Sequence, residues 1–229
     1  MSSHFYNEQL YPLQDKVMGL MGSIESPFYL TGGTLLSRYI LHHRYSDDLD
    51  FFANAIPDFH EQVDKIMEGV KREIPNVELS NKQDSYVRFY VYEGETILKI
   101  EFVNDVKYTV GQKGNAPSGI KLDTWQNVLS NKVTALSRLA AKDYVDILFL
   151  SFRYAFNWEN IIDEAKRKDA SVYEIEVSQY FFNFNLTKLN EVNFPDTFAP
   201  GLITAPYFQT LARESLHGFD NSLCGQTLH

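Results

Sequence analysis

The fold of this chain is decided by two short segments, Thr31-Gly32-Gly33-Thr34 and Ser46-Asp47-Asp48-Leu49-Asp50-Phe51-Phe52. The first is a tight turn that opens a helical segment, and the second is an apolar strand that begins with carboxylates. Successive side chains of a strand point to opposite faces, so Asp48 and Asp50 are expected to project side by side. Adjacent carboxylates repel each other unless a cation or a proton lies between them. Mg²⁺ is usually held by one or two carboxylates together with substrate phosphates. The pair therefore predicts half of a nucleotide–metal site.

The Gly32-Gly33 turn adds a second feature to this prediction. Glycines let backbone N–H groups approach an anion closely, and the N-terminus of the following helix favours negative charge. We therefore expect a triphosphate to lie between this turn and a metal held by Asp48 and Asp50. Asp47 alternates with Asp48 and is expected to face solvent.

Length and composition set outer limits on the class of protein. The 229 residues suffice for one large domain or two small ones, with the composition of a globular protein. A net charge of −9 argues against a broad nucleic-acid-binding surface, but it allows a local basic groove. The single cysteine, Cys224, cannot form an internal disulfide. Neither a signal-peptide pattern nor an apolar run of about 20 residues is found, so we expect a cytoplasmic protein without a membrane partner.

Hydrophobic periodicity predicts an α+β chain, in which a mixed pattern of strands and helices gives way to a mainly helical pattern near residue 119. Residues 172–185 suit either a helix or a strand, and the prolines that follow allow no assignment. We place the domain boundary after a polar loop at residues 111–119, so that residues 1–119 form a core with the metal site. Residues 120–229 then form a mainly helical region that completes the nucleotide site. Helices are expected at residues 5–22, 34–43, 58–74, 125–150, 157–168 and 211–216, and strands at residues 28–30, 49–52, 86–92 and 96–103.

The run LTGGTLLSRYILHHRYSDDLDFF, from Leu30 to Phe52, resembles the signature of the DNA polymerase β-like nucleotidyltransferase superfamily. In detail it is similar to the AbiEii/AbiGii toxin branch, where an Arg-x-Ser-x-Asp-x-Asp string is typical. A second block, from Lys132 to Asp146, is similar to the Lys…Ala-Leu…Arg…(Lys/Arg)-Asp-x-x-Asp-Leu motif of that branch. The resemblance covers residues 28–150 and implies a small mixed sheet flanked by helices, followed by a mainly helical region.

The resemblance also implies roles for the residues of the first block. Asp48 and Asp50 would bind Mg²⁺ or Mn²⁺, which makes them catalytic. Ser46 and the turn formed by Gly32, Gly33 and Thr34 would contact the phosphates of a nucleoside triphosphate.

In the second block, Lys132 would contact the triphosphate and Asp146 would complete the catalytic motif, with Lys142 beside it among the nucleotide-binding residues. On a straight helix Lys132 and Asp146 would stand about 21 Å apart, too far for both to touch one nucleotide. Either the chain breaks between Arg138 and Lys142, or one of the two residues is structural.

Polymerase β-like enzymes often add a third carboxylate from a later strand. Glu101 is the candidate metal ligand, because its strand parity places it with Lys99 on the face opposite Leu98 and Ile100. Asp105 is the alternative.

The implied function is transfer of a nucleoside monophosphate from a triphosphate to an acceptor, by an AbiEii-like toxin of a type IV toxin–antitoxin or phage-defence system. The acceptor would be tRNA or another RNA, or a protein, and a cognate antitoxin would be a partner. Two alternatives remain open at this point: a small-molecule nucleotidyltransferase of the antibiotic-modifying type, and a nucleotide-binding relative without catalysis.

Overall fold

The structure is a computed structural model that describes residues 2–228, and these residues form two compact units. The sheet unit comprises the described chain up to Leu35 together with Ser46–Thr124. The helical unit comprises Leu36–Tyr45 together with the described chain from Trp125 onward. A mixed sheet with flanking helices, followed by a mainly helical region, is the predicted α+β architecture.

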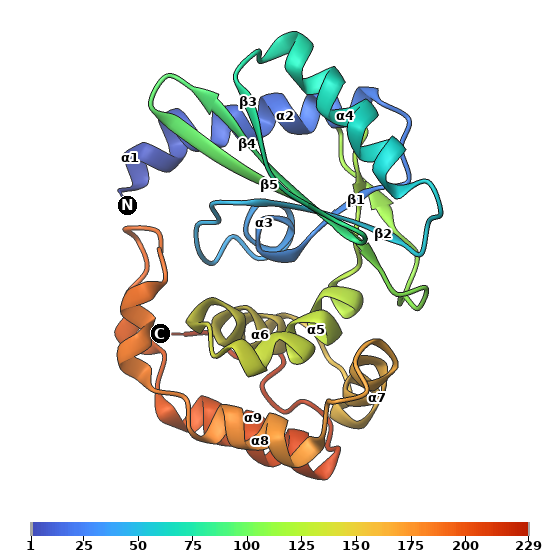
Figure 1. The fold of residues 1–229 in the computed structure, drawn as a ribbon. Coiled ribbons are helices and arrows are strands. Elements are labelled where there is room, and N and C mark those ends of the chain that lie inside the picture. Colours follow the sequence, from blue (N-terminus) through green and yellow to red (C-terminus); the bar gives the residue numbers. More distant parts are fainter. Residues whose placement is uncertain (1, 229) are drawn as a thin grey trace. The chain divides into compact units, whose positions relative to one another are not determined.

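The sheet unit is built on a seven-stranded sheet with the order β3-β4-β5-β2-β1-β7-β6 (Figure 1). Strand β2 pairs parallel with β5 and antiparallel with β1, and β4 and β5 form the predicted hairpin. The strands are β1 (Tyr29–Thr31), β2 (Leu49–Asn54), β3 (Val77–Gln83), β4 (Tyr86–Glu93), β5 (Thr96–Asp105), β6 (Gly114–Asn115) and β7 (Lys121–Leu122).

The two faces of this sheet differ in chemistry. Helices α2 and α4 cover one face, and α3 lies on the other (Figure 1). The side chains beneath α2 and α4 are apolar and buried, as in Phe89 of β4 and Ile100 of β5. The alternate residues of the same strands are mostly polar and mostly half-buried, so the sheet keeps a largely polar face for a site. The helical segments of this unit are α1 (Ser3–Phe5), η1 (Tyr6–Leu10), α2 (Tyr11–Ser23), α3 (Gly32–Leu35) and α4 (Phe59–Glu73).

The helical unit has an aromatic core. Tyr144, Trp158, Phe181 and Phe208 are buried and meet mainly edge to face, as in the 5.7 Å contact between the rings of Trp158 and Phe181. Its segments are η2 (Leu36–Ile40), α5 (Trp125–Thr134), η3 (Ala135–Arg138), α6 (Ala141–Arg153), α7 (Trp158–Lys168), α8 (Glu174–Phe182), η4 (Leu186–Glu191), η5 (Pro200–Leu202) and α9 (Ala205–His217).

Several elements differ from the sequence-based expectation. Strand β3 was not predicted, because its side chains are mostly exposed and its apolar alternation ends after Val77 and Leu79. The ambiguous segment at residues 172–185 contains helix α8, which buries Val177 and Phe181 at a spacing of one helical turn. Helix α9 begins six residues before the predicted start, with Pro206 in its first turn, where a missing N–H costs nothing.

The division into units also differs from the predicted boundary. The chain changes unit after Thr124 rather than after residue 119, and Leu36–Tyr45 groups with the helical unit although it lies inside the first predicted domain. No helix among residues 2–228 combines the length and the apolar character needed to cross a bilayer.

Candidate nucleotide and metal site

Asp48 and Asp50 lie where the apolar strand β2 begins. Leu49 and Phe51 are buried on the core side, which leaves Asp48 and Asp50 on the opposite, half-buried face. Asp50 is aligned with Thr31 of β1 on one side and with Glu101 of β5 on the other. The sheet register therefore places Asp50 between the end of β1, where the glycine turn begins, and the carboxylate of Glu101.

Gly32 brings the turn into direct proximity to Asp50. Its φ of +68° lies in the left-handed region, and a Cβ at this position would stand 2.5 Å from Asp50 Oδ2. Thr34 follows in α3, where its buried hydroxyl donates to the backbone carbonyl of Asp48. The turn and the carboxylate pair are thus held together by a glycine contact and a side-chain hydrogen bond.

Replacing Gly32 with alanine should disturb both stability and the carboxylates. We expect a loss of about 1–2 kcal/mol of unfolding free energy from the left-handed backbone, and a weaker affinity for Mn²⁺ because Asp50 must move. Urea denaturation and a Mn²⁺ titration measure the two effects. Gly19→Ala is the matched control, because Gly19 lies within α2 with open space around it. This change should raise the unfolding free energy by about 0.5–1 kcal/mol. Unchanged stability and Mn²⁺ affinity in Gly32→Ala would contradict this role of the turn.

The residues just before β2 are anchored to the N-terminal helices. Ser46 is buried; its N–H donates to the hydroxyl of Tyr11 at 3.3 Å, and its carbonyl accepts from Gln14 Nε2 at 3.0 Å. Asp47 is exposed as expected, and it accepts a hydrogen bond of 2.5 Å from the hydroxyl of Tyr6. These contacts fix the point at which the chain enters the strand that carries the carboxylates.

A lysine lies between two of the carboxylates. Lys99 Nζ is 2.9 Å from Asp48 Oδ2 and 3.1 Å from Glu101 Oε2. Burial on its own lowers the pKa of Lys99, but the bonds and charges of Asp48 and Glu101 more than offset this and raise it. The ammonium therefore stays charged and neutralises part of the repulsion between these carboxylates.

Glu101 binds basic groups through both of its oxygens. Its Oε1 accepts from Arg88 Nε at 2.9 Å, from Arg88 Nη2 at 2.6 Å and from the hydroxyl of Tyr86. Burial alone raises the pKa of Glu101, but the hydrogen bonds from Tyr86, Arg88 and Lys99 lower it to about 2. A metal could use this carboxylate only after at least one of these partners had moved.

Asp105, the alternative third carboxylate, lies at the far end of β5. It is aligned with Asn54, four residues beyond the alignment of Glu101 with Asp50, which is about 13 Å along the strand. Of the two candidates, Glu101 is therefore the one next to Asp50.

The donor set suits a magnesium ion that is also bound by phosphate. Asp48 and Asp50 offer hard oxygen donors on one face, which is the kind of ligand that Mg²⁺ and Mn²⁺ prefer. Among residues 2–228, no group of three Asp, Glu, His or Cys side chains is arranged to hold a metal by itself. The two carboxylates thus fit an ion whose remaining ligands come from substrate and water.

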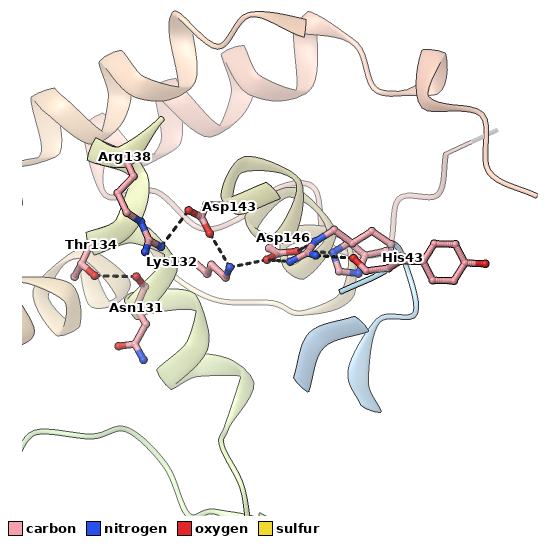
Figure 2. A network of polar contacts seen from close by, with 9 residues as sticks. His43, Asn131, Lys132, Thr134, Arg138, Asp143 and Asp146 are labelled. Carbon is pink, nitrogen blue, oxygen red and sulfur yellow. Dashed lines mark hydrogen bonds and ion pairs between the residues drawn. The ribbon is translucent and has the colours of Figure 1, made fainter. Parts of the chain in front are cut away.

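The second sequence block contains the predicted break. Helix α5 ends at Thr134, the turn η3 follows, and Leu139 adopts a φ of +53° before α6 begins at Ala141. Because of this break, Lys132 Nζ lies 2.7 Å from Asp146 Oδ2 and 2.6 Å from Asp143 Oδ1 (Figure 2). Of the two alternatives, the structure shows the break between Arg138 and Lys142, and the single helix expected over residues 125–150 is wrong.

Asp146 is the centre of a buried network of charged groups (Figure 2). Arg44 forms a bidentate contact with Asp146, in which Nε donates to Oδ1 and Nη2 donates to Oδ2, both at 2.7 Å. His43 Nε2 lies 2.8 Å from Oδ1, and the side chains of Asp146 and His43 are fully buried. Burial alone raises the pKa of Asp146, but Arg44, Lys132 and His43 hold it well below its usual range.

Sequence reasoning missed the part played by His43 and Arg44. Arg44 belongs to the quoted Arg-x-Ser string, but no local pattern indicates a partner so distant in sequence. Lys132 and Asp146, predicted to contact the nucleotide, are bound to each other, whereas Lys142 is exposed in the first turn of α6. Their contact with nucleotide stays a prediction.

Comparison with known proteins decides the family. The profile of a family described as "Nucleotidyl transferase AbiEii toxin, Type IV TA system" matches residues 22–213. The chain belongs to this AbiEii family. The match extends beyond the residues that carried the resemblance in sequence and includes the helical unit up to α9.

Two solved structures share the AbiEii chain's fold over nearly its whole length. JHP933 from Helicobacter pylori is 19% identical with a TM-score of 0.65, and covers 95% of this chain and 94% of its own. A candidate nucleotidyltransferase from H. pylori is 20% identical with a TM-score of 0.59, and covers 95% and 96%. These identities establish the fold alone, and no curated protein sequence matches the chain. The family is thus shown by the profile, and the fold by the two solved structures.

His43 should make the stability of this AbiEii protein depend on pH. Burial lowers its pKa below the ordinary value of 6.5, and its Nδ1 has no hydrogen-bond partner within residues 2–228. The unfolded state therefore binds more protons below that pH, and stability should fall as pH drops from about 6.5 toward the folded pKa. The slope from this one group is at most about 1.4 kcal/mol per pH unit.

Urea midpoints between pH 7.5 and 5.5 measure this effect. His43→Gln should flatten the curve over that range, whereas His42→Asn, at the exposed neighbouring position, should leave it unchanged. An identical pH dependence in His43→Gln and the unmodified protein would contradict the assignment.

Proposed function

We propose that this AbiEii protein transfers a nucleoside monophosphate from a nucleoside triphosphate to an acceptor, with Mg²⁺ or Mn²⁺ bound by Asp48 and Asp50. The observation that carries the proposal is the contact between the turn and the carboxylate pair. Gly32 has no room for a side chain because Asp50 lies against it, and Asp48 lies two residues away on the same face. A glycine turn and two hard oxygen donors are thereby combined in one place.

The residues of the sheet unit account for binding and alignment. Backbone N–H groups of the Gly32-Gly33 turn, with Thr34 and Ser46, contact phosphate oxygens, while Asp48 and Asp50 fix the position of the ions. When bound, the ions would lower the pKa of an acceptor hydroxyl and neutralise charge on the phosphates. The acceptor oxygen forms a bond to the α-phosphorus and loses its proton to solvent, while the bond from the α-phosphorus to the bridging oxygen of the β-phosphate breaks and pyrophosphate leaves. Charge neutralisation and alignment suffice for this chemistry.

The residues of the helical unit retain the roles that the resemblance implies. Lys132 and Lys142 are the proposed contacts to the triphosphate, and Asp146 completes the catalytic motif, with Lys132 Nζ 2.7 Å from its Oδ2. With two carboxylate partners, the Lys132 ammonium keeps one of its three N–H donors for a phosphate oxygen.

We assign the protein to the toxin class of its family, with tRNA, another RNA or a protein as acceptor and a cognate antitoxin as partner. A net charge of −9 disfavours a large RNA footprint, so RNA would be bound at a local basic surface.

The acceptor is tested by incubating the protein with Mg²⁺ and each of the four α-labelled ribonucleoside triphosphates. Parallel reactions receive bulk tRNA, a cell-protein extract or a set of aminoglycosides. We expect label in tRNA or protein and none in the aminoglycosides. Label in aminoglycosides alone would favour an antibiotic-modifying enzyme, and absence of released pyrophosphate in every reaction would favour a nucleotide-binding relative without catalysis.

A further inference from the structure

Two basic residues share the polar sheet face with the carboxylates. Glu101 on β5 is aligned with Asp50 of β2 on one side and with Arg88 of β4 on the other. Lys99 lies two residues before Glu101 on the same face of β5. Neighbouring strands are about 4.8 Å apart, so the Cα atoms of Arg88 and Asp50 are separated by about 10 Å. An arginine side chain directed along the sheet spans much of that distance.

Glu101 fixes the direction of both basic side chains. It binds Arg88 through Oε1 at 2.6 and 2.9 Å and Lys99 through Oε2 at 3.1 Å. The carboxylate is only 15% exposed, and the hydroxyl of Tyr86 also donates to it. A half-buried carboxylate whose contacts are all made to donors positions basic groups, in contrast to a ligand left open for a metal.

Arg88 and Lys99 retain capacity for a further anion. Their side chains are 33% and 26% exposed. A guanidinium carries five N–H donors and an ammonium three. Within the described part of the chain, Arg88 uses two nitrogens on Glu101, and Lys99 contacts only Asp48 and Glu101. Donors of both residues therefore remain for phosphate oxygens.

We propose that Arg88 and Lys99, oriented by Glu101, bind the terminal phosphates of the nucleoside triphosphate. The proposal rests on the nucleotidyl transfer put forward above and assigns Glu101 to positioning these cations. Arginine and lysine match phosphate geometry through multiple charged hydrogen bonds. A divalent ion on Asp48 would repel Lys99, which lies 2.9 Å from the same carboxylate. Lys99 then leaves Asp48, keeps its contact with Glu101 and turns toward the phosphates.

The phosphate site is tested with inorganic tripolyphosphate, because its recognition does not depend on the base. Calorimetric titration of the full chain with Mn²⁺ present should show an affinity about 10- to 100-fold lower for Arg88→Met and for Lys99→Met. Lys82→Met is the matched control: Lys82 lies on β3 of the same sheet and pairs with the exposed Asp64. The Lys82→Met variant should bind tripolyphosphate with unchanged affinity. Thermal melts verify that each variant is folded.

Titration with Mn²⁺ alone, followed by electron paramagnetic resonance, tests the positions of Lys99 and Glu101. Lys99→Met should bind Mn²⁺ several-fold more tightly than the unmodified protein, because Asp48 is then no longer paired with the Lys99 ammonium. Glu101→Gln should bind Mn²⁺ with unchanged affinity and tripolyphosphate more weakly. A large loss of Mn²⁺ affinity in Glu101→Gln would make Glu101 a metal ligand and overturn the proposal.

Other outcomes separate this inference from the proposed function. If Asp48→Asn loses Mn²⁺ while Arg88→Met and Lys99→Met bind tripolyphosphate normally, the phosphate site is wrong and the metal site stands. If Asp48→Asn keeps Mn²⁺ binding, the metal site itself is wrong. Normal tripolyphosphate binding combined with weakened tRNA binding in the two methionine variants would overturn the proposal in favour of an acceptor backbone site.

Discussion

Asp48→Asn should abolish the transfer of label from an α-labelled nucleoside triphosphate to the acceptor. The change keeps the shape of the side chain and removes the charge that would hold the divalent ion. Loss of several kcal/mol of transition-state stabilisation corresponds to a rate decrease of at least about 1,000-fold. Mn²⁺ affinity should fall in the same variant, which links the kinetic loss to the metal.

Asp47→Asn is the matched control for this experiment. Asp47 is an exposed neighbour that accepts a hydrogen bond from Tyr6, so its replacement should leave transfer and Mn²⁺ affinity near the unmodified values. Undiminished labelling by Asp48→Asn, or equal losses in the two variants, would contradict the assignment of Asp48 as a metal ligand.

Asp146→Asn should produce the largest loss of stability. Asp146 is fully buried and interacts with Arg44 and Lys132, so neutralising it leaves buried cations with one carboxylate fewer. Removing one partner of a buried ion pair costs about 3–5 kcal/mol, and urea denaturation measures the loss. Asp64→Asn is the control, since its pair with Lys82 is exposed and worth at most about 1 kcal/mol.

This stability contribution also has a defined pH range. The pKa of Asp146 is lower in the folded than in the unfolded state. Its contribution is therefore complete above the unfolded value of about 4 and is lost as pH falls from there toward the folded pKa. A change of less than about 1 kcal/mol in Asp146→Asn at neutral pH would contradict the structural role of the network.

The pairing of the two carboxylates could be predicted from sequence because it depends on local geometry. Alternation places Asp48 and Asp50 on one face of any strand, and the same rule placed Lys99 and Glu101 together on β5. The choice between Glu101 and Asp105 needed the parallel pairing of β2 with β5, which is a long-range property of the sheet. Strand parity alone allows both residues.

The arrangement of the second sequence block depended on features that leave no local signal. Ala140 and Ala141 favour helix, yet Leu139 adopts a left-handed conformation between η3 and α6. A left-handed leucine costs about 1–2 kcal/mol, and the break brings Lys132 within bonding distance of both Asp143 and Asp146. Only the family motif indicated this break.

The central claim, nucleotidyl transfer, is tested most directly by comparing the fate of α-label and γ-label. The same triphosphate, labelled in either position, is incubated with the protein, Mg²⁺ and the acceptor identified by the screen. We predict that the α-label becomes covalently attached to the acceptor, while the γ-label is released entirely as pyrophosphate. Attachment of the γ-label to the acceptor, or release of the γ-label as inorganic phosphate without attachment of the α-label, would contradict the claim.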